Sequence, residues 1–324
     1  MEENTEQRVD LTLFSEKIQE LKDRIASVIV GQEQTVDLVL TAILANGHVL
    51  IEGVPGVAKT LLARLTARLI DADFSRVQFT PDLMPSDVLG TTVFNMKTNG
   101  FDFHQGPIFA DIVLVDEINR APAKTQAALF EVMEERQISI DGTTHRMGDL
   151  YTILATQNPV EQEGTYKLPE AQLDRFLMKI TMDYPSLEEE VNILERHHTN
   201  AALVKLDDIT PAITKEELLS LRAFMNQVFV DRTLLQYIAL IVQQTRTSKA
   251  VYLGASPRAS VAMLQSSKAY ALLQGRDFVT PEDIKFVAPY VLQHRLILTA
   301  EAEMEGYSPV KVTQRLIDKV EVLS

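Results

Sequence analysis

Short apolar runs alternate with helical patterns between residues 48 and 185. Each run spans five or six residues, the usual length of a strand, and most are rich in aliphatic or β-branched side chains. Runs that alternate in this way with amphipathic helices are typical of a parallel sheet with crossover helices. We therefore expect one five-stranded parallel sheet sandwiched by helices. Its strands are predicted at residues 48–52, 75–80, 112–116, 151–156 and 177–182.

Helical periodicity places the helices that cover this sheet. At residues 124–135, the apolar side chains recur at three- and four-residue spacing, and the glutamates lie elsewhere on the helix. Helices at 13–29 and 35–45 flank a turn at Gly31. These patterns predict an N-terminal helical extension over residues 1–29 and an α/β core over residues 30–185.

Two segments within the core have the pattern of β-hairpins. They are residues 91–109 and 137–147, with expected turns at Asn99-Gly100 and Asp141-Gly142. Both are interpreted as insertions into the α/β core.

Only helical periodicity remains after residue 186. Ser186 with Glu189, and Thr280 with Asp283, pair a capping hydroxyl with an acidic first turn. A smaller all-α domain is therefore predicted over residues 186–324. Its helices are expected at 187–198, 214–228, 233–247, 256–273 and 280–297.

Composition narrows the possible chemistry. The 324 residues are 46% hydrophobic and 23% charged, as expected for a globular chain of about two domains. The absence of cysteine excludes disulfides, thiolate metal sites and a cysteine nucleophile. The histidines lack metal-ligand spacing, so we expect them to be solvated or satisfied by hydrogen bonds.

Charge and hydropathy bear on partners and location. No apolar run reaches the roughly 18 residues that span a bilayer, so membrane insertion is not expected. Residues 1–10 are acidic where a signal peptide would be basic, which favours a cytoplasmic location. The net charge of -14 opposes binding to nucleic acid or to an anionic membrane.

A phosphate-binding loop follows the first predicted strand. Its sequence is Gly53-Val54-Pro55-Gly56-Val57-Ala58-Lys59-Thr60. Glycines let backbone amides converge on phosphate oxygens at a helix N-terminus, lysine contacts the β and γ phosphates, and a hydroxyl holds magnesium. Ala58 stands where the general pattern has glycine, so we expect a helix-compatible φ there. A plain Gly-Pro turn before a helix is the alternative interpretation.

Two carboxylates, Asp116 and Glu117, close the third strand. The first is placed to hold magnesium and the second to polarise an attacking water beside the γ-phosphate. Acidic pairs also cap helices that follow strands, so the order of the two motifs along the chain is what favours the catalytic interpretation.

Three further residues are candidates for the same site. Asn158 follows the fourth strand and could orient the water, although Asn before Pro also starts turns. Arg175 precedes the fifth strand and Arg258 opens a predicted lid helix, and an arginine can stabilise developing phosphoryl charge. A surface pair between Asp174 and Arg175, or a simple helix start at Arg258, remain open alternatives.

With these motifs, the chain resembles a MoxR-family AAA+ ATPase from Val30 to Ile297. The phosphate loop matches the family version, alanine included. Other matching segments are Phe79-Thr80-Pro81-Asp82-Leu83-Met84-Pro85-Ser86-Asp87, Asp116-Glu117-Ile118-Asn119-Arg120-Ala121-Pro122, Met133-Glu134-Glu135-Arg136-Gln137, Ala155-Thr156-Gln157-Asn158-Pro159 and Leu168-Pro169-Glu170-Ala171-Gln172-Leu173-Asp174-Arg175-Phe176.

The resemblance implies a P-loop fold with a helical lid, and roles for individual residues. Lys59 and Thr60 would be the Walker A residues, and Asp116 and Glu117 the Walker B pair, with Thr60 and Asp116 holding Mg²⁺. Asn158 would be the first sensor, Arg258 the second sensor, and Arg175 a finger reaching a neighbouring subunit, with Arg120 as the next candidate. The residues that would border the adenine are Val30, Gly31 and Gln32. The hairpins would be the helix-2 insert and the hairpin before the first sensor.

The resemblance also implies partners. Family members bind ATP, assemble as rings that are typically hexamers, and remodel or activate partner proteins, often ones with a von Willebrand factor A domain. Three other classes stay open: a nucleic-acid motor, a nucleotide-gated switch and the motor of a metal chelatase. Acidic charge and the aromatic, acidic segment Phe101-Asp102-Phe103-His104 count against the first. The sequence does not name the client, the pathway, the ring stoichiometry or whether hydrolysis threads, unfolds or only switches the partner.

Overall fold

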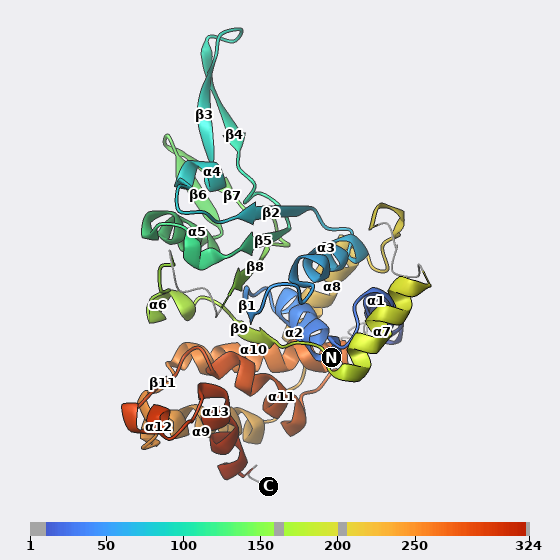
Figure 1. Ribbon diagram of the computed structural model, residues 1–324, viewed down its shortest axis with the longest axis vertical. Coiled ribbons are helices and arrows are strands. Elements are labelled where there is room, and N and C mark those ends of the chain that lie inside the picture. The colour runs from blue at the N-terminus through green and yellow to red at the C-terminus, as the bar shows by residue number, and fades with distance from the viewer. Residues whose placement is uncertain (1–10, 159–164, 200–205, 322–324) are drawn as a thin grey trace, which may run out of the picture.

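A five-stranded parallel sheet forms the centre of the computed structural model, which describes residues 11–158, 165–199 and 206–321 (Figure 1). The strand order is β2-β5-β8-β1-β9, and every neighbouring pair is parallel. This confirms the sheet that the apolar runs predict. The strands are β1 Val49–Gly53, β2 Phe74–Gln78, β5 Ile112–Asp116, β8 Thr152–Gln157 and β9 Met178–Met182.

The sheet is buried on both faces. Val49 and Ile51 of β1 belong to an apolar cluster with α1, α2 and α3, whereas Leu50 belongs to a second cluster with α5. This period of two is what a strand between two helical layers requires. The helices of this part are α1 Leu11–Val28, α2 Glu33–Leu44, α3 Lys59–Leu69, α4 Pro85–Leu89, α5 Ala123–Glu135 and α6 Glu170–Leu173, with a 3-10 turn at Ile118–Arg120.

Two hairpins leave the core at the same end of the molecule (Figure 1). They pair β3 Gly90–Asn95 with β4 Gly100–Gln105, and β6 Gln137–Ile140 with β7 Thr143–Arg146. The predicted Asp141-Gly142 turn is confirmed, with φ values of +49° and +79°. The predicted Asn99-Gly100 turn is wrong in detail, because Gly100 pairs with Asn95 inside the ladder. The reversal takes residues 96–99, and Asn99 alone among them has a left-handed φ, of +50°.

Five helices form the lid below the sheet (Figure 1), with bounds α9 Arg232–Thr247, α10 Pro257–Leu273, α11 Pro281–Leu292, α12 Ala300–Met304 and α13 Pro309–Lys319. A short antiparallel ladder joins β10 Val251–Leu253 to β11 Ile297–Leu298, so the lid is helical apart from this pair. The sequence did not predict α12 or α13.

Two predicted helices end earlier than periodicity suggests. The helix expected at 280–297 ends at Leu292, because the following residues turn to bond the core and then enter β11. The helix expected at 214–228 is α8 Lys215–Phe224, followed by the 3-10 turn Met225–Gln227. The capping hydroxyls of Ser186 and Thr280 accept backbone hydrogen bonds as predicted.

The helices that follow the last strand of the sheet pack against different parts of the molecule. Arg196 of α7 Leu187–His198 donates to the carbonyls of Ala26 and Ser27 in α1, at 3.1 and 2.7 Å. Arg222 of α8 donates to the carbonyl of Ile43 in α2 at 2.6 Å. In the lid, α10 packs on α2 and α11 packs on β9. The predicted domain limits at residues 30 and 186 stay predictions.

No described helix has both the length and the apolar character that crossing a membrane requires.

Candidate functional site

The phosphate loop connects the end of β1 to the start of α3. Two of its residues have a left-handed backbone: Gly56 with a φ of +89° and Ala58 with a φ of +61°. The expectation of a helix-compatible φ at Ala58 is therefore wrong. The chain must reverse sharply between a buried strand and a buried helix, and left-handed residues provide such a reversal. A Cβ at Gly56 would meet no atom within 4 Å, so this side of the loop is open.

Lys59, the first residue of α3, turns back over the loop. Its Nζ donates to the carbonyl oxygen of Gly53 at 2.5 Å. Burial lowers the pKa of the Lys59 ammonium, and the nearby carboxylates of Asp116, Glu117 and Glu52 oppose that shift. The structure thus brings Lys59 close to the two carboxylates that end β5.

The Asp116 carboxylate is buried at the end of β5, with 7% of the residue exposed. One oxygen accepts from Arg76 Nε at 2.6 Å, and the other accepts from Thr156 Oγ1 at 3.1 Å. The same hydroxyl oxygen accepts from the backbone amide of Glu117 at 3.0 Å. Thr156, on the neighbouring strand β8, therefore orients both residues of the acidic pair.

Glu117 projects from a left-handed backbone with a φ of +56°. Its Oε2 accepts from Gln78 Nε2 at 2.8 Å and pairs with Arg120 Nε at 3.0 Å. Arg120, the reserve candidate for a finger, thus bonds a carboxylate of its own chain.

Sequence reasoning missed Arg76, Gln78 and Thr156. Arg76 lies in the middle of β2, Gln78 at its end, and Thr156 near the end of β8; these two strands lie on either side of β5. A search for polar side chains near the ends of every predicted strand could have found them, because parallel strands end at one edge of a sheet.

Asn158 directly follows β8, the strand that neighbours β5, and it is buried. The turn of Val30, Gly31 and Gln32 joins α1 to α2. Gly31 has a φ of +72°, a left-handed conformation that favours glycine, and the Glu189 carboxylate packs against its Cα side.

Arg175 and Arg258 meet at one carboxylate. Arg175 Nη2 lies 2.8 Å from Glu134 Oε2, and Arg258 Nη2 lies 3.1 Å from Glu134 Oε1. Their side chains are 29% and 64% exposed. The alternative of an Asp174–Arg175 pair is not what the structure shows, because Asp174 pairs with Arg295 at 2.6 Å.

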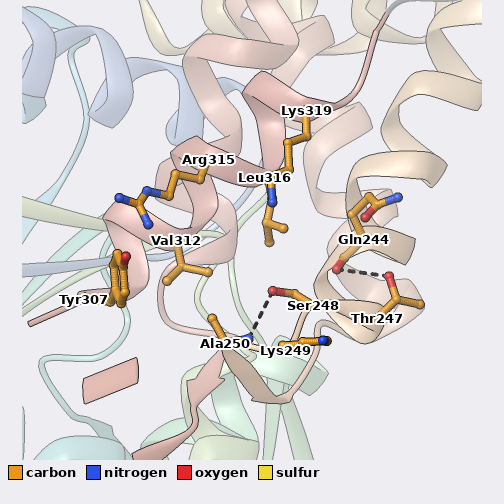
Figure 2. Close-up of a pocket in the computed structure, with 10 residues that line it drawn as sticks. All are labelled: Gln244, Thr247, Ser248, Lys249, Ala250, Tyr307, Val312, Arg315, Leu316 and Lys319. Carbon is orange, nitrogen blue, oxygen red and sulfur yellow. Dashed lines mark hydrogen bonds between the residues drawn. The ribbon is translucent and has the colours of Figure 1, made fainter. Parts of the chain in front are cut away.

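The lid contains a separate hollow of about 420 Å³ (Figure 2). Figure 2 shows Arg315 and Lys319 on α13 and Lys249 after α9, around the apolar side chains of Val312 and Leu316. Arg315 lies over the ring of Tyr307, 4.4 Å from its centroid. None of the predicted site residues lines this hollow.

Comparison with known proteins agrees with this geometry. A family model described as the ATPase family associated with various cellular activities (AAA) matches residues 48–178. A model described as an AAA lid domain matches residues 243–318.

Relatives match nearly the whole chain. Uncharacterized protein YeaC of Bacillus subtilis is 47% identical over 93% of each chain. Chaperone MoxR1 of Mycobacterium tuberculosis is 44% identical over 91% of this chain and 80% of its own length. The crystal structure of a candidate ATPase from Cytophaga hutchinsonii superposes with a TM-score of 0.89 at 40% identity, covering 97% of both chains.

The parallel sheet, the phosphate loop before α3, the acidic pair after β5 and the helical lid define an AAA+ ATPase of the P-loop class. Within that class, the chain belongs to the MoxR family.

Proposed function

We propose that this protein binds ATP with Mg²⁺, hydrolyses it in a ring of subunits, and uses the turnover to remodel or activate a partner protein. The observation that carries this proposal is the convergence of Lys59, Asp116 and Glu117 at one edge of the sheet. A Gly-Pro turn without a nucleotide would not need a half-buried lysine placed near two carboxylates.

The residues present fit the nucleotide and the metal. Gly53 to Thr60 offer backbone amides at the N-terminus of α3, whose dipole favours phosphate. The Thr60 hydroxyl and the Asp116 carboxylate are hard oxygen donors of the kind Mg²⁺ takes. Bound there, Mg²⁺ neutralises charge that develops on the phosphate oxygens. The assignment of Val30, Gly31 and Gln32 to the adenine rests on the family resemblance.

Glu117 is proposed to accept a proton from the attacking water, with Asn158 orienting that water from β8. Its carboxylate already bonds Gln78 and Arg120, so these two residues set the direction in which it points. The buried Thr156 hydroxyl accepts from the Glu117 amide and donates to the Asp116 carboxylate, so it fixes both residues.

Arg175 is proposed to stabilise phosphoryl charge at a neighbouring subunit's site, and Arg258 to sense the nucleotide from the lid. Both arginines pair with Glu134, not with the acidic pair of their own chain. Arg175 is the proposed finger and Arg258 the proposed second sensor on the lid. A hexamer is the ring size that the family resemblance favours.

The hairpins support a protein client over a nucleic acid. Phe94 and Phe101 are exposed on the β3–β4 hairpin and contact each other edge to face, with centroids 5.3 Å apart. Asp102 of the same hairpin bonds Asn95, and an acidic side chain there disfavours a phosphate backbone. A partner with a von Willebrand factor A domain is proposed from the family resemblance, and the relative in M. tuberculosis is called a chaperone.

Two variants test the nucleotide site. Lys59→Ala should weaken ATP affinity about ten- to hundred-fold, from the roughly 1.5–3 kcal/mol of a charged hydrogen bond. Glu117→Gln should keep ATP affinity and lose about 10²–10⁴-fold in turnover, because only the proton acceptor is removed. Affinity by calorimetry and phosphate release are the measurements. Lys311→Ala and Glu131→Gln, on exposed helix faces, are the matched controls.

Wild-type ATP affinity in Lys59→Ala would contradict the assignment of the loop. Equal turnover in Glu117→Gln and in the wild type would remove Glu117 from the mechanism. The Glu117→Gln protein, held in its ATP-bound state, is also the form with which to capture the client.

A mixture tests the proposed finger. Arg175→Ala and Glu117→Gln should each be inactive, and their mixture should recover part of the turnover. Recovery is expected because mixed interfaces pair an intact Arg175 with an intact Glu117 from another chain. No recovery, under conditions where the subunits exchange, would place Arg175 outside the neighbour's site.

A further inference from the structure

The segment that carries Arg175 is held by three consecutive lid residues, Gln293, His294 and Arg295, called the lid clamp below. They follow α11, where the helical pattern of the sequence continues but the helix itself has ended. All three bond the segment between Asp174 and Lys179, which joins α6 to β9.

Arg295 makes most of these contacts. Its Nε donates to Asp174 Oδ1 at 2.6 Å, and its Nη2 donates to the carbonyls of Asp174 and Phe176, at 3.2 and 2.7 Å. Its Nη1 donates to the carbonyl of Leu177 at 3.1 Å. Only 4% of the Arg295 side chain is exposed, so the Asp174 carboxylate supplies the opposite charge that a buried guanidinium needs.

The other two clamp residues extend the same contact. His294 Nε2 lies 3.0 Å from the carbonyl of Phe176, and Gln293 Nε2 donates to the carbonyl of Lys179 at 2.5 Å. Burial, together with the adjacent charge of Arg295, lowers the pKa of His294. A neutral imidazole therefore donates through Nε2 to Phe176.

The amides of the same segment bond residues outside the lid. The Phe176 amide donates to the carbonyl of Leu173 in α6 at 3.1 Å, and the Leu177 amide donates to the carbonyl of His48 in the core at 2.8 Å. The Phe176 ring is fully buried, edge to face with Phe130 of α5. The carbonyls on both sides of Arg175 thus accept from Arg295 of the lid, whereas the amides on both sides bond carbonyls of α6.

We infer that Arg295 is a positioning residue for Arg175, so that the orientation of the lid in one subunit sets hydrolysis at its neighbour's site. This inference rests on the proposed function, in which Arg175 acts on a neighbouring subunit. The clamp bonds flank Arg175 in the chain, at Asp174 and at Phe176, so a shift of the lid displaces its Cα. A displacement of about 1 Å costs on the order of 100-fold in rate when a catalytic group must meet a reacting atom.

Glu134 adds a second link between lid and finger. Arg258, at the start of α10, and Arg175 both pair with its carboxylate. The side chain of Arg175 is therefore held through Glu134, and its neighbouring backbone is held through Arg295. The lid therefore has two points of contact with the finger.

Arg295→Lys is the variant that tests the inference. Lysine keeps the charge beside Asp174 but cannot present a planar fork to several carbonyls at once. Turnover should fall on the order of 100-fold with ATP affinity unchanged within about two-fold. Arg276→Lys is the matched control, because Arg276 forks onto Asp283 entirely within the lid at 2.8 and 2.5 Å. The control should keep wild-type turnover.

Mixing separates a positioning role from damage to the chain's own nucleotide site. Arg295→Lys mixed with Glu117→Gln should recover part of the turnover, because the second protein supplies an intact finger and the first an intact acidic pair. Arg295→Lys mixed with Arg175→Ala should not recover, since both proteins lack a working finger.

The inference is overturned if Arg295→Lys recovers activity with Arg175→Ala, or if it loses no more turnover than Arg276→Lys. If Arg295→Lys does not fold, Gln293→Ala takes its place and should lose about three- to ten-fold in turnover, as expected for one net hydrogen bond. No loss in that variant also overturns the inference. Failure of the reference mixture of Arg175→Ala and Glu117→Gln would instead remove the proposed finger, and this inference with it.

Discussion

Ala58 has a backbone conformation that alanine rarely adopts. Its φ of +61° and ψ of 23° place it at the N-cap of α3, where the loop reverses into the helix. A left-handed conformation costs an alanine roughly 1–2 kcal/mol, because its Cβ crowds the neighbouring carbonyl oxygen. The strain lies next to Lys59, and the packing of β1 and α3 on either side of the loop holds it in place.

Ala58→Gly should therefore raise the free energy of unfolding by about 0.5–1 kcal/mol, because the relief of strain exceeds the added chain entropy. If Ala58 had a helix-compatible φ, the same substitution would lower the free energy of unfolding. The matched control is Ala127→Gly at an exposed position of α5, which should lower the free energy of unfolding by about 1 kcal/mol. Chemical denaturation of the three proteins provides the measurement, and a loss of equal size in both variants would contradict the left-handed assignment.

Several elements of the core meet at one buried histidine. His48 Nδ1 accepts from the amide of Ile153 in β8 at 3.0 Å, so Nε2 carries the hydrogen and donates to the carbonyl of Met133 in α5 at 3.1 Å. His48 thus connects the start of β1 to β8 and α5. Both of its ring nitrogens are hydrogen-bonded, as the sequence-based expectation requires for this histidine. Burial, helped by the charge of Arg136, lowers the pKa of His48 to about 3.

The free energy of unfolding should therefore fall as the pH is lowered below neutral. The folded state keeps His48 neutral down to a pH of about 3, whereas the unfolded chain takes up a proton near pH 6.5. The contribution of neutral His48 to the free energy of unfolding is complete above the pKa of His48 in the unfolded chain, and it is lost as the pH falls below that pKa. Between pH 7 and pH 5, this amounts to about 2 kcal/mol at about 1.4 kcal/mol per pH unit.

His48→Gln removes this titration, and a glutamine amide can still donate and accept. The variant should be less stable at pH 7 but lose less stability on going to pH 5. Denaturant titrations at both pH values measure the free energy of unfolding of the wild type and of the variant. Other buried groups such as His294 are present in both proteins and so cancel in the comparison. Parallel losses in the two proteins would show that His48 does not carry the pH dependence.

The whole molecule joins its lid to its core through a continuous apolar cluster. Buried side chains of α10 and α11 belong to the same cluster as those of α1, α2 and one face of the sheet. The lid clamp and Glu134 add polar links at the edge of that contact. The parts that carry Lys59 and Arg258 are therefore joined by both apolar and polar contacts within each chain, and the proposed site is completed by another chain.

Turnover per subunit should accordingly rise with protein concentration through the range in which subunits assemble, because each hydrolysis site is proposed to take an arginine from a neighbour. Phosphate release and the assembly state, measured on the same dilution series, should rise together. Arg175→Ala should assemble in the same range without the rise in turnover. Constant turnover per subunit across the assembly transition would contradict a shared site.

Local patterns in the chain were sufficient to predict the strands, the phosphate loop and the acidic pair. A strand buried on both faces needs a continuous apolar run, and Gly53 to Thr60, Asp116 and Asn158 follow such runs directly. Parallel strands end at one edge, so the order of these residues along the chain already implied that they meet. The capping hydroxyls of Ser186 and Thr280 are equally local, because each bonds an amide three residues away.

Tertiary packing decided what depends on residues far apart in the chain. Asp174 and Arg295 are 121 positions apart, and Arg258 and Glu134 are 124 apart, so no periodicity links them. The end of α11 at Leu292 depends on the carbonyls that Gln293, His294 and Arg295 meet in the core. The left-handed Ala58 follows from how β1 and α3 pack, because a loop between two buried elements takes the backbone angles that their positions impose.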